Sequence, residues 1–277
     1  MPSTPASLHY IVAATPRSGS TLLCELLKGT GIAGQPNEDF QALRSTSQSR
    51  QPRQYFEGVD GDFVDRLAPT DPGEPETDAE FAAALEASFA ASTTPNGVYG
   101  TKVMWGYFDL LAQRLATLPG LADASLPEAL EATFPNLHFI QIQRQDKVGQ
   151  AISLWTAVQT RTWRDEGEGP AHAAEPFYDF AAIDHLVKLQ TSHEDAWTDW
   201  LGRHDFPTRT VVYEDFVADD PRTEVADVAR WLGVPGADEL RVPEPKMRRQ
   251  GNGRSKEWAD RYRDEAGAGA APGSGGR

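Results

Sequence analysis

Cysteine and basic residues are both scarce in this sequence, and the two shortages limit what the protein can do. A single cysteine, Cys24, among 277 residues excludes an intrachain disulfide and is typical of a reducing compartment. Lysine and arginine number 26 against 41 aspartate and glutamate residues, which leaves a formal net charge of −15. Because nucleic acids and anionic membrane surfaces bind basic stripes, we expect neither of them as a partner.

Long apolar runs and targeting patterns are missing as well. A membrane-spanning helix needs about 20 consecutive apolar residues, and the sequence has no such run. The first residues show no basic segment followed by an apolar one, which would indicate a secretory signal. Together with the single cysteine, these observations predict a cytoplasmic protein without membrane insertion.

Several signatures of metal-dependent and hydrolytic sites are also absent. The six histidines show no metal-ligand spacing. The chain lacks the Gly-x-x-x-x-Gly-Lys-Ser/Thr pattern of Mg-ATP sites and the Gly-x-Ser-x-Gly pattern of a nucleophilic serine. We therefore predict no metal cofactor.

What the sequence does contain is a regular alternation of strand and helix patterns. Apolar, β-favouring segments predict strands at 8–14, 98–103, 137–142 and 208–213. Helical periodicity predicts helices at 20–29, 54–67, 78–91, 146–161, 177–203 and 222–232. This alternation predicts an α/β fold with a mainly parallel sheet, whose ligands bind at the carboxyl ends of the strands. We expect one domain over residues 1–265, followed by a disordered Gly/Ala-rich tail at 266–277.

The link between the first strand and the first helix has the chemistry of an anion site. Arg17-Ser18-Gly19-Ser20-Thr21 aims backbone N–H groups, hydroxyls and the positive end of a helix dipole at one point. Gly19 lets the chain approach an anion closely, and Arg17 adds a fixed charge with fork geometry. The alternative is a plain strand–turn–helix whose hydroxyls only cap the helix.

Six segments in order give this loop a more specific meaning. They are residues 16–23, 33–41, 46–49, 100–105, 158–164 and 254–262. The first resembles the 5′-phosphosulfate loop of sulfotransferases, and together they resemble the Stf0 family from about Tyr10 to Arg263. The best-known members of that family are bacterial trehalose 2-sulfotransferases. The resemblance implies a three-layer P-loop-like α/β fold whose central, mainly parallel sheet is flanked by helices, and 3′-phosphoadenosine 5′-phosphosulfate (PAPS) as the sulfuryl donor.

The resemblance also implies which residues hold the donor. In the wider superfamily, a strand-end arginine and a serine on the next helix bind the 3′-phosphate, and a late basic loop covers it. The donor-binding candidates are accordingly Arg17, Ser18, Gly19, Ser20, Thr21, Arg144, Ser153, Arg249 and Arg254. An arginine at a strand end can also grip a phosphate bidentately on physical grounds. The alternatives are an ion pair of Arg144 with Asp146, and a solvated turn around Arg249 and Arg254.

Two residues are candidates for the chemical step. Glu38 stands where Stf0 members carry their proposed general base, which removes the acceptor's hydroxyl proton as the O–S bond forms. Asp39 competes for this role, and we expect one of the two acids to face the site and the other to face solvent. Lys102 ends a predicted strand and could neutralise charge on the leaving group. A solvated loop acid and a strand-end lysine paired with an acid are the alternatives.

The acceptor is expected to bind near the loop that follows the first helix. Its candidate contacts are Pro16, Gln35, Pro36, Asn37, Asp39, Phe40, Gln41, Arg50 and Tyr55. Four of these positions differ from trehalose-sulfating relatives, which tend to carry Gln, Glu, Pro and Trp where this chain has Pro16, Gln35, Arg50 and Tyr55. Because buried hydrogen-bonding sites discriminate strongly between ligands, the changes argue against trehalose itself. They leave a trehalose-like disaccharide, another glycan or a hydroxylated metabolite open.

We therefore predict a PAPS-dependent O-sulfotransferase that acts on a hydroxyl of a carbohydrate or a related metabolite. The alternatives are a nucleotide-dependent small-molecule kinase and a catalytically silent nucleotide-binding protein. Residues 159–164 match a region near the dimer contact in Stf0 relatives, so the resemblance implies a homodimer. Trp105, Trp155 and Trp163 are expected in the core or in that contact rather than beneath the adenine ring.

Overall fold

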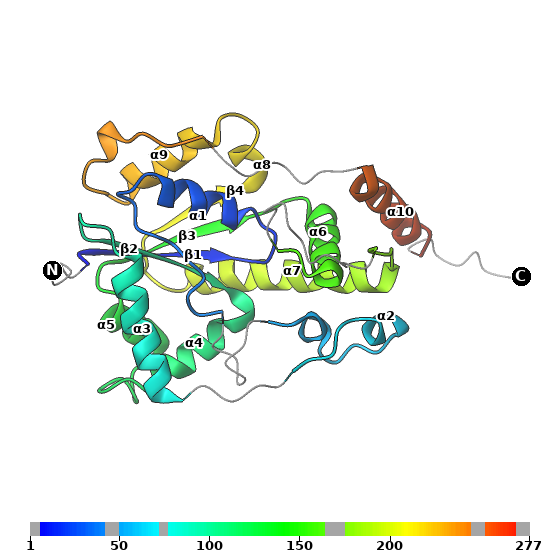
Figure 1. Cartoon of the computed structure of the whole chain (residues 1–277), viewed down its shortest axis with the longest axis horizontal. Coiled ribbons are helices and arrows are strands. Elements are labelled where there is room, and N and C mark those ends of the chain that lie inside the picture. The colour runs from blue at the N-terminus through cyan, green and yellow to red at the C-terminus, as the bar shows by residue number, and fades with distance from the viewer. Residues whose placement is uncertain (1–5, 42–49, 72–76, 164–174, 245–252, 270–277) are drawn as a thin grey trace, which may run out of the picture. The chain divides into compact units, whose positions relative to one another are not determined.

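The computed structural model describes residues 6–41, 50–71, 77–163, 175–244 and 253–269 (Figure 1). The chain forms two compact units. The first comprises residues 1–51, 71–145 and 192–246, and the second comprises residues 52–70, 146–191 and 247–277. The expectation of one domain over residues 1–265 stays a prediction.

A four-stranded parallel sheet forms the centre of the first unit. Its strands are β1 (Leu8–Ala14), β2 (Val98–Met104), β3 (Leu137–Gln143) and β4 (Thr208–Val212), in the order β2-β1-β3-β4. Every pairing is parallel, so the four carboxyl ends lie along one edge of the sheet. All residues of β1 are buried because this central strand is covered on both faces, which explains its continuous apolar sequence.

Helices cover both faces of this sheet (Figure 1). Alternate residues of β1 belong to two different cores, with Tyr10 and Val12 on one face and Ile11 and Ala13 on the other. The first face packs against α1 (Ser20–Gly29) and α9 (Pro221–Trp231). The second packs against α3 (Asp78–Ser92), α4 (Phe108–Leu115), α5 (Leu126–Thr133) and the part of α7 (Phe180–Gly202) from residue 192 onward. The predicted three-layer α/β class with a parallel sheet is confirmed.

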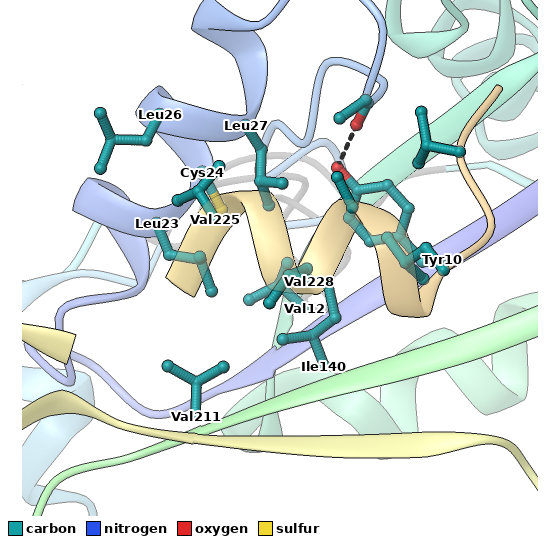
Figure 2. Packing of buried hydrophobic residues seen from close by; sticks show 14 of the residues in the cluster. Tyr10, Val12, Leu23, Cys24, Leu26, Leu27, Ile140, Val211, Val225 and Val228 are labelled. Carbon is teal, nitrogen blue, oxygen red and sulfur yellow. Dashed lines mark hydrogen bonds between the residues drawn. The ribbon is translucent and has the colours of Figure 1, made fainter. Parts of the chain in front are cut away.

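The core on the α1 face fixes where the chain goes after α1. Figure 2 shows Leu23 and Leu27 packed with Val225 and Val228 of α9 above the sheet. The hydroxyl of Tyr10 donates a buried hydrogen bond of 2.6 Å to the carbonyl of Ala33 (Figure 2). This bond ties the segment after α1 to the sheet, and so begins to position the residues that follow.

Gly100 makes room for that arrangement. A Cβ atom at this position of β2 would lie 2.4 Å from the ring of Tyr10, closer than real carbon contacts allow. A glycine is therefore required where the tyrosine ring crosses the neighbouring strand.

The second unit consists of short and long helices around an aromatic core. Its elements are η1 (Pro52–Phe56), α2 (Asp62–Asp65), α6 (Lys147–Thr160), the first part of α7 and α10 (Gly253–Gly269). The predicted single helix at 54–67 is wrong. Gly58 adopts a left-handed conformation with φ of +77°, which ends η1 and separates it from α2.

Trp155 lies at the centre of this second core. Its side chain is fully buried, and its ring nitrogen donates to the carbonyl of Phe177 at 2.8 Å. Helix α10 continues to Gly269, beyond the predicted boundary at residue 265, and residues 270–277 lie outside the described part of the chain.

Three further short elements lie in the described residues of the first unit. They are η2 (Trp105–Tyr107), α8 (Tyr213–Phe216) and η3 (Ala237–Glu239). The first two follow the carboxyl ends of β2 and β4 directly, so they begin at the edge where the sheet is expected to bind ligands.

Candidate active site

The link between β1 and α1 has the backbone geometry of an anion-binding turn. Arg17 has a φ of +63° and Gly19 a φ of +91°, both in the left-handed region. Alternation of left- and right-handed residues turns successive N–H groups toward one point. Helix α1 begins directly after Gly19, has no acidic residue in its first turn, and leaves its first N–H groups without intrahelical partners. The sequence-based prediction of an anion site here has a matching backbone.

Ser18 adds a polar atom that has no partner in the described part of the chain. Its side chain is fully buried, and within the described residues its hydroxyl has no hydrogen-bond partner. Leaving a buried polar group unsatisfied costs about 1–3 kcal/mol. A hydroxyl in this state beside a helix N-terminus fits an anionic ligand.

Gly19 is required at this point for two reasons. Its left-handed conformation is unfavourable for any residue with a Cβ atom. In addition, a Cβ atom there would lie 2.2 Å from the ring of Tyr213, the first residue of α8. Tyr213 was not among the predicted site residues, although its place directly after β4 at the ligand-binding edge is a usable signal.

Arg144 lies against this loop. Its Nη1 donates to the carbonyl of Arg17 at 2.9 Å, and its guanidinium lies 4.7 Å from the centre of the Tyr213 ring. Its backbone N–H donates to a carboxylate oxygen of Glu194 at 3.0 Å. The structure thus brings Arg144 together with the loop that precedes α1, and no sequence pattern indicated the contribution of Glu194.

Glu38 and Lys102 form an ion pair at the carboxyl edge of the sheet. The ammonium of Lys102 lies 2.8 Å from Oε2 of Glu38, and the hydroxyl of Tyr107 donates to Oε1 at 3.2 Å. The Lys102 side chain is only 7% exposed and that of Glu38 is 23% exposed, so the pair is largely shielded from water. Lys102 lies within β2, two residues before its end, and is paired with an acid that is also the predicted base.

Asp39 points to a different set of partners. One of its carboxylate oxygens accepts hydrogen bonds from the hydroxyls of Ser88 and Ser92, at 2.8 Å and 3.2 Å. The expectation that one of the two neighbouring acids faces solvent is wrong, because both carboxylates have protein partners.

The predicted acceptor contacts differ in how deeply they are buried. Phe40 is 1% exposed and packs in the core with Phe81. Pro36 is buried, Gln41 is exposed, and Pro16 is half-buried two residues after the end of β1. The placement of Phe40 and Pro36 shows how strongly this loop is held by the core, while their role toward an acceptor stays a prediction.

Asn37 and Gln35, the other two candidates in this loop, bind neighbouring elements through backbone atoms. The carbonyl of Asn37 accepts from the N–H of Lys102 at 2.7 Å, which adds a parallel bridge to the edge of β2. The N–H of Gln35 donates to the carbonyl of Ser92 at 3.0 Å. The loop is therefore attached to both a strand and a helix.

Arg50 lies close to the same edge. Its guanidinium is 2.6 Å from the point where a Cβ atom on Gly106 would be, and the ring of His193 is 3.4 Å from that point. Burial, with the nearby charge of Arg50 as a second cause, lowers the pKa of His193 to about 4. Arg50 thus has a neutral imidazole beside it at neutral pH.

The remaining predicted residues belong to the second unit. Tyr55 is 7% exposed, and its ring stacks on Trp163 with 5.9 Å between the centroids. Ser153 is half-buried on α6, and Arg254 is exposed in the first turn of α10. Arg249 lies outside the described residues. Their roles toward the donor and the acceptor stay predictions.

Three further observations concern other kinds of site. Burial raises the pKa of the Cys24 thiol to about 11, which makes it an unreactive core residue. Within the described ranges, no group of three or more His, Cys, Asp or Glu side chains could hold a metal ion. None of the helices in those ranges combines the length and the apolar character needed to cross a membrane.

The chain matches known proteins over almost its full length. The family model described as Stf0 sulphotransferase matches residues 9–265. A trehalose 2-sulfotransferase of Mycobacterium tuberculosis is 41% identical over 259 residues, which cover 93% of this chain and 95% of that protein. A trehalose 2-sulfotransferase of Mycolicibacterium smegmatis is 38% identical over 259 residues, with the same two coverages.

Solved structures resemble the chain only weakly. A sulfotransferase from Mycobacterium tuberculosis aligns with a TM-score of 0.39 at 18% identity, covering 94% of this chain and 77% of the solved one.

Proposed function

Because the chain belongs to the Stf0 sulphotransferase family and is therefore a sulfotransferase, we propose that it transfers a sulfuryl group from PAPS to a hydroxyl of a carbohydrate. The observation that carries the proposal is the Glu38–Lys102 pair, which lies at the carboxyl edge of a parallel sheet. The choice of a sugar rests on the two relatives, both of which are named for a sulfated disaccharide.

The donor would be held by the loop between β1 and α1. When bound, PAPS supplies the activated sulfuryl group. Arg17 to Thr21 offer a guanidinium, converging N–H groups and the unsatisfied hydroxyl of Ser18 to its anionic end. Arg144, which already touches this loop, would add a second cation for the 3′-phosphate.

Glu38 would act as the general base. As the acceptor oxygen forms its bond to sulfur, the hydroxyl proton passes to the Glu38 carboxylate, and the bond from sulfur to the donor's phosphate oxygen breaks. The products are a sulfate ester and adenosine 3′,5′-bisphosphate. Tyr107 holds one carboxylate oxygen and Lys102 the other, which fixes the plane of the base.

Lys102 would have a second task. A cation beside the base is also close to where negative charge develops, because the base and the transferred group meet at the same acceptor oxygen. An ammonium that is shielded from water interacts with such charge more strongly than an exposed one. Its pairing with Glu38 keeps it in place before the substrates bind.

An acceptor panel with radiolabelled PAPS tests the proposed function. Trehalose, other disaccharides, monosaccharides and hydroxylated glycosides are compared, and at least one sugar should become labelled. Turnover should fall about 10²- to 10⁴-fold in Glu38→Gln, the usual contribution of a positioned base, while the affinity for PAPS stays nearly constant. Full turnover in Glu38→Gln would refute the assignment of the base.

A further inference from the structure

The carboxylate of Asp39 is the centre of a buried hydroxyl cluster on the α3 side of the sheet. Its Oδ2 accepts from Ser88 at 2.8 Å and from Ser92 at 3.2 Å, and the Thr101 hydroxyl lies 3.4 Å from the same oxygen. Ser88 is 4% exposed, and Ser92 and Thr101 are fully buried. Burying a hydroxyl is costly unless it has a partner, and the Asp39 carboxylate supplies that partner for Ser88 and Ser92.

The cluster has a fixed hydrogen-bond direction. The hydroxyls of Ser88 and Tyr99 lie 2.6 Å apart, and either could donate to the other. Because an ionised Asp39 can only accept, the Ser88 hydrogen points to it and Tyr99 must be the donor to Ser88. Burial, together with the nearby charge of Asp39, raises the pKa of Tyr99, so it keeps its proton and remains a donor. The chain from Tyr99 through Ser88 to Asp39 therefore has one orientation.

Asn37, the residue before Glu38, is attached to strand β2. The carbonyl of Asn37 accepts from the N–H of Lys102 at 2.7 Å and from the Thr101 hydroxyl at 3.1 Å. Glu38 thus stands between two anchored neighbours. Two consecutive residues of β2, Thr101 and Lys102, bind Asn37, and Lys102 also supplies the cation that pairs with Glu38.

We propose that Asp39 is a positioning residue, which fixes the backbone of the 37–39 segment so that the Glu38 carboxylate stays within reach of the acceptor hydroxyl. The proposal rests on the proposed function, in which Glu38 is the base. A base acts over about 2.6–3.2 Å, and a misplacement of about 1 Å can cost roughly 10²-fold in rate. In this role Asp39 acts through Glu38 and touches neither the acceptor nor the donor, unlike the acceptor contact that the sequence predicts.

A double-mutant cycle tests the coupling between the two acids. Asp39→Asn keeps the side-chain shape but removes the charge that organises the hydroxyls. We expect kcat to fall about 10- to 100-fold, with the KM for PAPS unchanged. In Glu38→Gln/Asp39→Asn the loss in kcat should equal that of Glu38→Gln alone. Once the base has been removed, disturbing its position has no further effect. The assay uses radiolabelled PAPS and the panel sugar with the highest turnover.

Two more variants separate positioning from general damage. Ser88→Ala/Ser92→Ala removes two donors and leaves Asp39 intact, and it should reproduce the fall in kcat. Glu86→Gln makes the same carboxylate-to-amide change at an exposed position of α3, and it should leave kcat unchanged. Hydrogen exchange of the Lys102 amide, which donates to Asn37, should quicken in Asp39→Asn but not in Glu38→Gln.

The outcomes distinguish a positioning role of Asp39 from an independent role and from no role. Losses that multiply in the double variant would show that Asp39 works independently of Glu38, and would overturn the proposal while leaving the base intact. Unchanged kcat in Asp39→Asn, with or without faster exchange at Lys102, would overturn it as well. Full activity of Glu38→Gln would show that Glu38 is not the base, and it would refute the proposed function together with this inference.

Discussion

Replacing Gly19 by alanine should disable the donor loop for a reason that can be calculated from the structure. The new methyl group would lie 2.2 Å from Cδ2 and 2.7 Å from Cε2 of Tyr213. Carbon atoms normally approach to about 3.5–4.0 Å, so the ring must move by more than about 1 Å. That movement also disturbs Arg144, whose guanidinium lies 4.7 Å from the ring centre.

Gly31 provides a matched control for the backbone strain that alanine would introduce at position 19. It also has a left-handed φ, +73°, but a Cβ atom there would meet nothing within 4 Å. Gly31→Ala should therefore cost only the backbone strain, about 1–2 kcal/mol. Gly19→Ala should cost that amount and about 1–3 kcal/mol more for overpacking. In a chain of this size, each kcal/mol lowers Tm by about 2–4 °C.

Thermal denaturation with and without adenosine 3′,5′-bisphosphate measures both effects. At a hundredfold excess over Kd, the nucleotide should stabilise the wild-type protein and Gly31→Ala by about 2.7 kcal/mol, but stabilise Gly19→Ala far less. Adding Tyr213→Ala to Gly19→Ala should remove the overpacking cost. If Gly19→Ala matched Gly31→Ala in stability and in nucleotide response, the reasoning about Tyr213 and the loop would be refuted.

Three further outcomes are expected. Adenosine 3′,5′-bisphosphate should raise Tm much more than 5′-AMP, since each extra phosphate contact strengthens binding to the folded state, and equal shifts would contradict the assignment of Arg144 and Ser153. The pKa of His193 is lowered to about 4 in the folded protein, against about 6.5 in the unfolded chain, so the unfolded state binds the extra proton between these values. Wild-type stability should therefore fall as pH drops from 6.5 to 4, and His193→Gln should lose less over that window in denaturant titrations; equal losses would count against the buried neutral histidine. A homodimer is expected in solution, and light scattering that gave a mass near 30.3 kDa at micromolar concentration would rule it out.

Local sequence patterns were sufficient for the first strand and the first helix. The predicted first strand and first helix have the observed bounds, Leu8–Ala14 and Ser20–Gly29, because a continuous apolar run and a loop with glycine specify them locally. The same reasoning failed at residues 54–67. Apolar periodicity continued across Gly58, but the left-handed conformation of Gly58 interrupted the helical backbone. Motif order along the chain was enough to indicate the family that the comparisons show.

Contacts between distant segments depend on how the elements pack. Glu38 meets Tyr107, 69 positions further on, and Asp39 meets Ser88, 49 positions further on. Both depend on the strand order β2-β1-β3-β4, which places β2 beside β1 and directs the chain after α1 over its edge. Residue types and motif order indicated which groups are candidates for the chemistry. The pairing of Glu38 with Lys102, the anchoring of Asp39 and the ring of Tyr213 against Gly19 were decided by packing, because these distances follow from the way the strands and helices meet.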